Sequence, residues 1–183
     1  MQRIDEENLS FSFGDQWQVC KLDDHPFYRN RMEKIDGTKA LDFLGIYDKK
    51  ELYFIEVKDF REYRIKSKKR ISNGELIIEI AQKVTGSISC IIGAYRMENN
   101  PELWNPYAEM LLNKSIKLKV ILWLETDFPL DYVSERQKGR NSVSTKILKQ
   151  KMNWITSHVL SCSLRENKLP DMEVRNLPMQ ENL

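Results

Sequence analysis

One stretch of the sequence, KALDFLGIYDKKELYFIEVKDF from Lys39 to Phe60, constrains the fold more than any other. Two apolar runs, residues 40–47 and 52–57, flank the polar turn DKKE. This pattern is typical of two antiparallel strands joined by a short loop, so we expect a β-hairpin here.

Three charged side chains interrupt this hairpin where a core strand would continue with Val or Ile. Side chains alternate between the two faces of a strand, so Glu56 and Lys58 should point the same way. In a hairpin that turns near Lys49, Asp42 lies roughly opposite Glu56. Two carboxylates and one ammonium group then converge at one end of the sheet, which is tolerable only if a cation, the lysine or both neutralise the carboxylates.

The pattern of an aspartate followed by Glu-x-Lys on the next strand resembles the PD-(D/E)xK nuclease superfamily, which includes restriction endonucleases, resolvases and repair nucleases. The resemblance covers about residues 39–95, and Leu41 stands where the family has a proline. Similar triplets occur at residues 48–50 and 166–168, but only the copy at Glu56 ends a strongly apolar strand that follows a strand with an acid.

The resemblance implies an α/β fold with a central mixed β-sheet flanked by helices, a restriction endonuclease-like core. It also implies hydrolysis of phosphodiester bonds in DNA with Mg²⁺ or Mn²⁺, in repair, restriction or defence. The superfamily includes members that keep the fold without turnover. A catalytically inactive module that binds nucleic acid or another protein is therefore the alternative function.

The resemblance assigns roles to the residues of the hairpin. Asp42 and Glu56 would be carboxylate ligands of the metal ion, and the backbone carbonyl of Val57 would be a third ligand. Lys58 would hold or deprotonate the attacking water, or stabilise the developing negative charge. The sequence does not separate these roles.

Accessory residues are expected on two helices. Family members often carry another metal-binding glutamate on the first helix, which makes Glu6 and Glu7 candidates, although an acidic helix start also explains them. A polar residue of the helix after the Glu-x-Lys strand reaches the active site in some branches, so Glu79 or Gln82 would assist. A solvated outer helix face is the alternative.

The net charge of +2 conceals two basic segments, residues 61–70 and 134–151, each with six basic residues and one acid. Such segments favour a local surface that binds the phosphates of DNA without reading its sequence, and solvated loops and helix faces are the alternative. The side chains expected at phosphates are Lys66, Lys68, Lys69, Arg70, Arg136, Lys138 and Arg140.

Length and composition limit the other classes of function. The chain has 183 residues, of which 41% are hydrophobic, enough for one domain with one well-filled core. We expect residues 1–183 to form this single domain, with a polar tail from about residue 165. The three cysteines are widely spaced, which disfavours disulfide bonds and a zinc site. With two histidines in the sequence, a Ser-His-Asp catalytic triad is also disfavoured.

The expected surroundings follow from similar reasoning. No unbroken apolar run approaches the ~18 residues of a membrane span, so we expect a soluble cytoplasmic protein without a membrane partner. Cutting both DNA strands with so small a chain would favour a homodimer, and a protein partner would supply targeting, because no separate recognition domain is apparent.

The remaining periodicities predict further elements. Helices are expected over residues 6–11, 75–92 and 101–112 and after Ser144, and strands over residues 16–22, 117–125 and 159–164.

Overall fold

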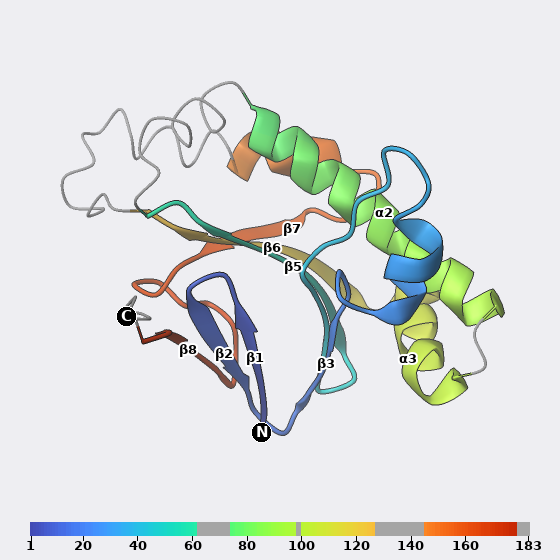
Figure 1. The fold of residues 1–183 in the computed structure, drawn as a ribbon, viewed down its shortest axis with the longest axis horizontal. Coiled ribbons are helices and arrows are strands. Elements are labelled where there is room, and N and C mark those ends of the chain that lie inside the picture. Colours follow the sequence, from blue (N-terminus) through green and yellow to red (C-terminus); the bar gives the residue numbers. More distant parts are fainter. Residues whose placement is uncertain (62–73, 98–99, 127–144, 179–183) are drawn as a thin grey trace, which may run out of the picture.

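The computed structural model describes residues 1–61, 74–97, 100–126 and 145–178. It is a mixed α/β fold with two β-sheets and several helices. Three layers follow one another in Figure 1: helix α2 (Glu75–Met97), a five-stranded sheet, and a three-stranded sheet on the far side.

The five-stranded sheet is mixed, as expected. Its strands follow the order β3 (Trp17–Lys21), β4 (Phe43–Tyr47), β5 (Glu51–Asp59), β6 (Lys117–Glu125) and β7 (His158–Cys162). The first two pairings are antiparallel and the last two are parallel. Every strand predicted for this sheet is present, and β7 lies at its edge.

The predicted hairpin is confirmed as β4 and β5. Phe43 pairs with Ile55, so the register places Asp42, just before β4, opposite Glu56. The turn uses positive φ angles at Asp48 and Lys49, 48° and 51°, a conformation that the short polar Asp side chain tolerates better than most.

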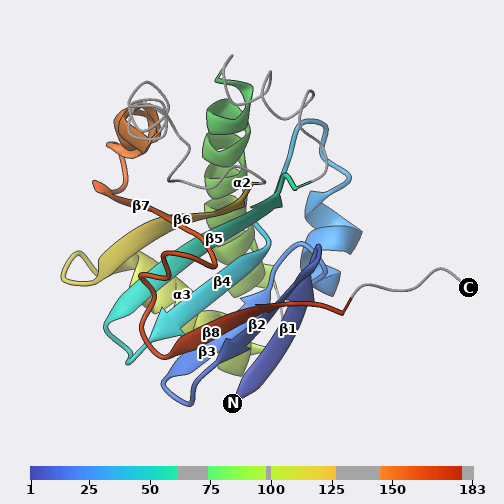
Figure 2. The same cartoon turned by 90° about the vertical axis from the view of Figure 1, so that its left-hand side faces the viewer.

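Helix α2 covers the face of the sheet on which Leu52 and Phe54 lie, and its buried residues form one core with them. It continues five residues beyond the predicted end at residue 92. Helix α3 (Pro101–Leu112) follows, with the Asn100 side chain accepting a hydrogen bond from the Leu103 N–H. A further helix, residues 145–152, lies on the same side of the sheet as α2 (Figure 2).

Helix α2 is also long and apolar enough to cross a membrane, which a count of unbroken apolar runs does not reveal. The core helix of a soluble protein has the same length and composition. Eight α2 side chains are buried in this fold, in line with a core helix, so its composition is weak support for a membrane span.

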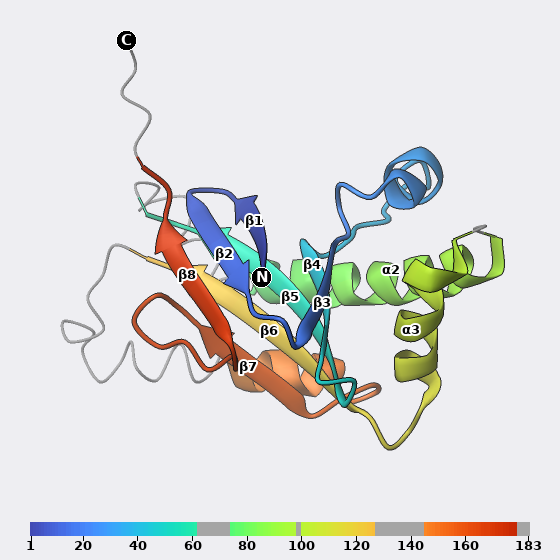
Figure 3. The same ribbon diagram turned by 90° about the horizontal axis from the view of Figure 1, so that it is seen from below.

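The second sheet was not predicted. It consists of β1 (Gln2–Glu6), β2 (Leu9–Phe13) and β8 (Met172–Asn176), in the order β1-β2-β8 (Figure 3). The helix expected over residues 6–11 is therefore wrong. Alternate residues of β2, from Leu9 to Phe13, pack against Phe43 and Trp123 on the face of the large sheet away from α2, a period of two that requires a strand.

Candidate active site

The segment that leads into β4 positions Asp42 against both the sheet and α2. Leu22 N–H donates to the Asp42 carbonyl at 2.9 Å, which ties the residue to the end of β3. Leu41 N–H donates to Ser87 Oγ of α2 at 3.0 Å. Lys39 crosses α2 at Gly86, so closely that a Cβ at Gly86 would lie 2.0 Å from the Lys39 carbonyl oxygen.

Glu56 is the most completely buried charged residue of the site. Its side chain is 0% exposed, and its Oε1 lies 2.6 Å from Lys58 Nζ and 2.7 Å from Lys83 Nζ. Both contacts are ion pairs. Neither carboxylate oxygen of Glu56 makes a hydrogen bond of regular geometry within the described part of the chain. Two cations therefore offset one buried negative charge.

Asp42 joins the same cluster. Its Oδ2 accepts a hydrogen bond from the Val57 N–H at 2.6 Å, and its Oδ1 lies 3.5 Å from Lys83 Nζ. The structure thus brings together Asp42, Glu56 and Lys58 as the sequence predicted. Val57 contacts Asp42 through its amide N–H, and its carbonyl remains a predicted metal ligand.

Lys83 is the residue of this cluster that the sequence analysis missed. It contacts both carboxylates, and only 15% of its side chain is exposed. The signal was available, since Lys83 follows Ile80 by three residues and precedes Ser87 by four, and both of these are buried on the sheet-facing side of α2. A lysine inside an apolar stripe needs a buried partner.

The pKa values reflect this crowding. Burial, and then repulsion from Asp42, raises the pKa of Glu56 from 4.5 to about 7, although Lys58 and Lys83 oppose the shift. Burial by itself would lower the pKa of Lys83, but the negative charges of Glu56 and Asp42 outweigh it and hold that pKa above its ordinary value. Lys83 is therefore charged at neutral pH.

A second acidic cluster shares Asp42. Glu6 at the end of β1, Asp23 just after β3 and Asp42 each offer one carboxylate oxygen, and these oxygens lie within 4.8 Å of one another. Burial, and then the charges of Asp42 and Glu6, raises the pKa of Asp23 to about 6. Its Oδ1 is buried and has no hydrogen-bond partner among the described residues.

These three carboxylates could hold a metal ion, because hard divalent cations prefer oxygen ligands and would relieve the mutual repulsion. Lys21 partly offsets the cluster, with its Nζ 2.9 Å from Glu6 and 2.8 Å from Asp24. Asp23 is not among the site residues predicted from the sequence. The missing information was the antiparallel pairing of β3 with β4, which brings Leu22 to Asp42 and so the next residue, Asp23, close to the Asp42 carboxylate.

The predicted accessory residues lie at different distances from the cluster of Asp42, Glu56, Lys58 and Lys83. Glu6 belongs to the acidic cluster. Glu7 accepts a hydrogen bond from the Asp59 N–H at the end of β5, and burial raises its pKa, while the charges of Lys58 and Asp42 also act on it. Glu79 is near enough to Lys83 for its charge to favour the ammonium form. Gln82 is exposed and lines a surface groove on α2.

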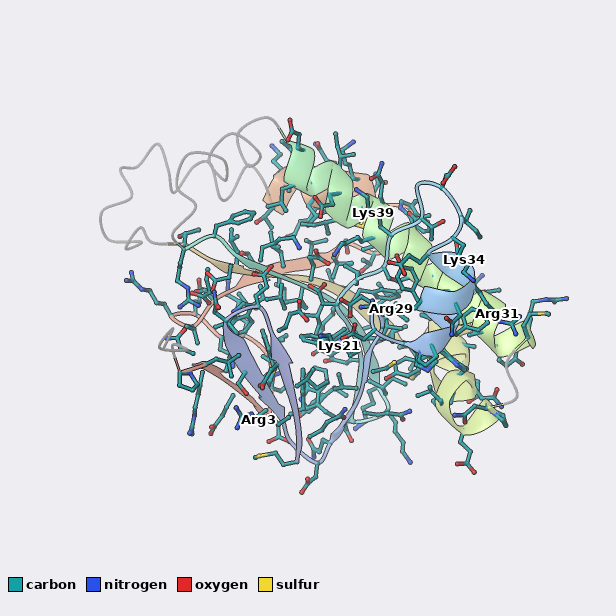
Figure 4. All side chains as sticks on the ribbon, viewed as in Figure 1. Arg3, Lys21, Arg29, Arg31, Lys34 and Lys39 are labelled. Carbon is teal, nitrogen blue, oxygen red and sulfur yellow. The ribbon has the colours of Figure 1, made fainter. Side chains whose placement is uncertain are left out.

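The basic residues predicted at phosphates, residues 66–70 and 136–140, lie outside the described residues. Other cations of the described chain lie on the segment between β3 and β4, which leads to Asp42. In Figure 4, Arg29, Arg31 and Lys34 lie on and after the π-helical turn at Tyr28–Met32, and Lys39 lies next to α2. All four side chains are exposed.

Comparison with protein-family models, with curated proteins and with solved structures gave no match. The side-chain geometry is therefore the basis for assigning a function.

Proposed function

We propose that this protein is a divalent-metal-dependent nuclease of the PD-(D/E)xK type that hydrolyses phosphodiester bonds in DNA. The observation that carries the proposal is the contact of Asp42 and Glu56 with one common ammonium group, Lys83 Nζ, while Lys58 pairs with Glu56. The mixed sheet, with a long helix following the Glu-x-Lys strand, supports a restriction endonuclease-like core.

The donor set fits Mg²⁺ or Mn²⁺, because all the candidate side-chain ligands are carboxylates. Asp42 belongs to both acidic groups, with Glu6 and Asp23 on one side and Glu56 on the other. Asp23 Oδ1 is buried and has no hydrogen-bond partner among the described residues, which supports a cation held by Glu6, Asp23 and Asp42. When bound, such a cation neutralises charge at the scissile phosphate and lowers the pKa of a coordinated water.

Lys58 then acts beside the reacting phosphate. Its side chain is 13% exposed, at the point where β5 reaches the site, and its pairing with Glu56 fixes the position of its ammonium. A held ammonium can orient the attacking water or stabilise negative charge that develops on the phosphate. The Val57 N–H holds Asp42 Oδ2, so Asp42 Oδ1, which lies 3.5 Å from Lys83 Nζ, would be the oxygen for ligation.

Exposed cations would bind the DNA backbone beyond the cut site. Arg31, Lys34 and Lys39 are exposed on the segment that leads to Asp42. The rings of Phe27 and Tyr28 are buried, so this segment would bind phosphates without stacking on bases. The basic segments at residues 61–70 and 134–151 would extend the surface.

One observation favours a second candidate, a DNA-binding or protein-binding module without turnover. With Glu56 ionised, Asp42, Glu56, Lys58 and Lys83 carry two negative and two positive charges in close contact. A cluster that is already neutral holds together without a metal ion, as a structural ion-pair network would.

DNA cleavage tests the proposal. Supercoiled plasmid and a labelled single-stranded oligonucleotide are incubated with the full chain and Mg²⁺ or Mn²⁺, and wild type is compared with Asp42→Ala and Lys58→Ala. We expect each variant to cut at least roughly 100-fold more slowly, because each loses a group that contacts the reacting phosphate or its cation.

Glu51→Gln is the matched control. Glu51 is a half-buried carboxylate of the same strand, paired with Lys119 at 2.7 Å, but it lies at the opposite end of β5 from Glu56. The control should cut like wild type. Unchanged cutting by Asp42→Ala and Lys58→Ala would point to a contaminant or another site, whereas DNA binding without cutting by wild type would support the second candidate.

The surroundings remain proposals as well. We propose a cytoplasmic protein that acts as a homodimer when it cuts both strands, with a protein partner that directs it to its target. Sedimentation of the chain with and without duplex DNA would test for the dimer.

A further inference from the structure

Lys83 occupies the position at which a cation would join the two catalytic carboxylates. Its ammonium lies 2.7 Å from Glu56 Oε1 and 3.5 Å from Asp42 Oδ1. A divalent ion shared by these two carboxylates would need the same position, at the shorter distance of about 2.0–2.2 Å for Mg²⁺ or Mn²⁺ ligands.

The charge of the cluster strengthens the competition between Lys83 and a divalent cation for the position between Asp42 and Glu56. With Glu56 ionised, the charges of Asp42, Glu56, Lys58 and Lys83 sum to zero. A divalent cation placed between Asp42 and Glu56 would leave two excess positive charges among these largely buried groups. The group formed by Glu6, Asp23 and Asp42 has more negative charge to offset. In the described part of the chain its carboxylates contact Lys21, which Asp24 shares, and Lys83, which lies closer to Glu56 than to Asp42.

We infer that Lys83 is a built-in counter-cation, which joins Asp42 to Glu56 in the metal-free protein and must leave before Glu56 can serve as a metal ligand. The inference rests on the proposed function for the identity of the competing cation. Lys83 is therefore a positioning residue, because its departure from Glu56 determines when Glu56 can bind the metal ion.

The helix offers Lys83 a second partner. Glu79 lies four residues earlier on the same helix, the spacing at which side chains of one helix face meet. A change of side-chain rotamer would carry the Lys83 ammonium from Glu56 towards Glu79 without moving the backbone. The flexible lysine stem has the rotatable bonds for this motion.

Metal binding without catalysis tests the inference. Mn²⁺ is titrated calorimetrically into the full chain at neutral pH for wild type, Lys83→Met and Glu56→Gln. We expect Lys83→Met to bind Mn²⁺ roughly tenfold or more tightly than wild type, because the competing charge is gone while the apolar stem remains. The gain should vanish when Glu56→Gln is added to Lys83→Met.

Lys119→Met is the matched control. Lys119 Nζ lies 2.7 Å from Glu51 Oε2, with 20% of the side chain exposed, so it is a comparably placed lysine in an ion pair away from the site. Its Mn²⁺ affinity should equal that of wild type. This comparison separates competition at the site from a general effect of losing one positive charge.

A measurement on wild type does not depend on the folding of Lys83→Met. The side-chain ¹⁵N–¹H signals of lysine ammonium groups are followed during a titration with diamagnetic Mg²⁺. The signal of buried Lys83, assigned by its loss in Lys83→Gln or Lys83→Arg, should shift as its partners change, while that of Lys119 stays in place.

Three results would overturn the inference. Equal Mn²⁺ affinity of wild type and Lys83→Met, with an unmoved Lys83 signal, would show that Lys83 does not compete although a metal binds, which leaves the proposed function intact. Weaker binding by Lys83→Met would show that Lys83 supports the site. Absence of Mn²⁺ binding by wild type would remove the metal-dependent function together with the inference.

Discussion

Gly86 offers a quantitative test of how α2 positions Asp42. In Gly86→Ala the new Cβ would lie 2.0 Å from the Lys39 carbonyl oxygen and 3.1 Å from its carbon, where real Cβ atoms essentially never come within 3.0 Å of another heavy atom. Either α2 or the segment that leads to Asp42 must move by about 1 Å, and such overpacking costs about 1–3 kcal/mol.

Gly93→Ala on the same helix is the matched control. Its Cβ would lie 3.5 Å from the Phe27 ring, an ordinary contact. Both substitutions replace a glycine inside α2 and gain about 0.5–1 kcal/mol of helix propensity, which cancels in the comparison. The free energy of unfolding of Gly86→Ala should therefore fall about 1–3 kcal/mol below that of Gly93→Ala.

Urea denaturation followed by far-ultraviolet circular dichroism measures this difference. Heating provides a second measure, because 1 kcal/mol corresponds to a change in Tm of about 2–4 °C for a chain of this size. The Mn²⁺ affinity of Gly86→Ala should also fall, because Asp42 moves with residues 39–41. Equal denaturation midpoints for the two variants would refute the view that Lys39 and Gly86 form a close-packed contact that sets the position of Asp42.

Two further predictions concern pH and the interior. Because the pKa values of Asp23 and Glu56 are raised in the folded state, to about 6 and about 7, these two groups bind more protons in the folded than in the unfolded metal-free protein. The stability that they contribute should decline as pH rises from about 4 to 7. Asp23→Asn should flatten the lower part of this decline by on the order of 1 kcal/mol in urea titrations at several pH values, and an unchanged slope would contradict the assignment. Buried Tyr107 donates its hydroxyl to the Gln18 and Leu44 carbonyls, at 3.2 and 3.3 Å, so Tyr107→Phe should lower the free energy of unfolding by about 1–2 kcal/mol. Exposed Tyr95→Phe is its control, and equal midpoints for the two variants in urea would count against these hydrogen bonds.

The local signals of the sequence predicted the large sheet well. The hairpin at residues 43–59, the strand Lys117–Glu125 and the helix that begins at Glu75 follow from period and turn chemistry, which act between neighbours in the chain. The same alternation placed Glu56 and Lys58 on one face with Asp42 opposite.

The second sheet could not be predicted in this way. Strand β8 becomes a strand by pairing with β2, more than 150 residues earlier in the chain, and its own sequence, MEVRN, has one polar face and little apolar content. The helix predicted over residues 6–11 is wrong for the same reason, because β2 pairs with β8 from the other end of the chain. The apolar alternation of β2 was the better guide.

The sequence by itself determined that an aspartate, a glutamate and a lysine meet at one end of a hairpin, because strand alternation and a short turn leave those side chains no other arrangement. Only the tertiary structure decided which other charges join them. Lys83 arrives from a helix packed across the sheet, and Glu6 and Asp23 arrive from other strands, because long-range pairing and packing bring distant charges into one buried volume where each needs a partner.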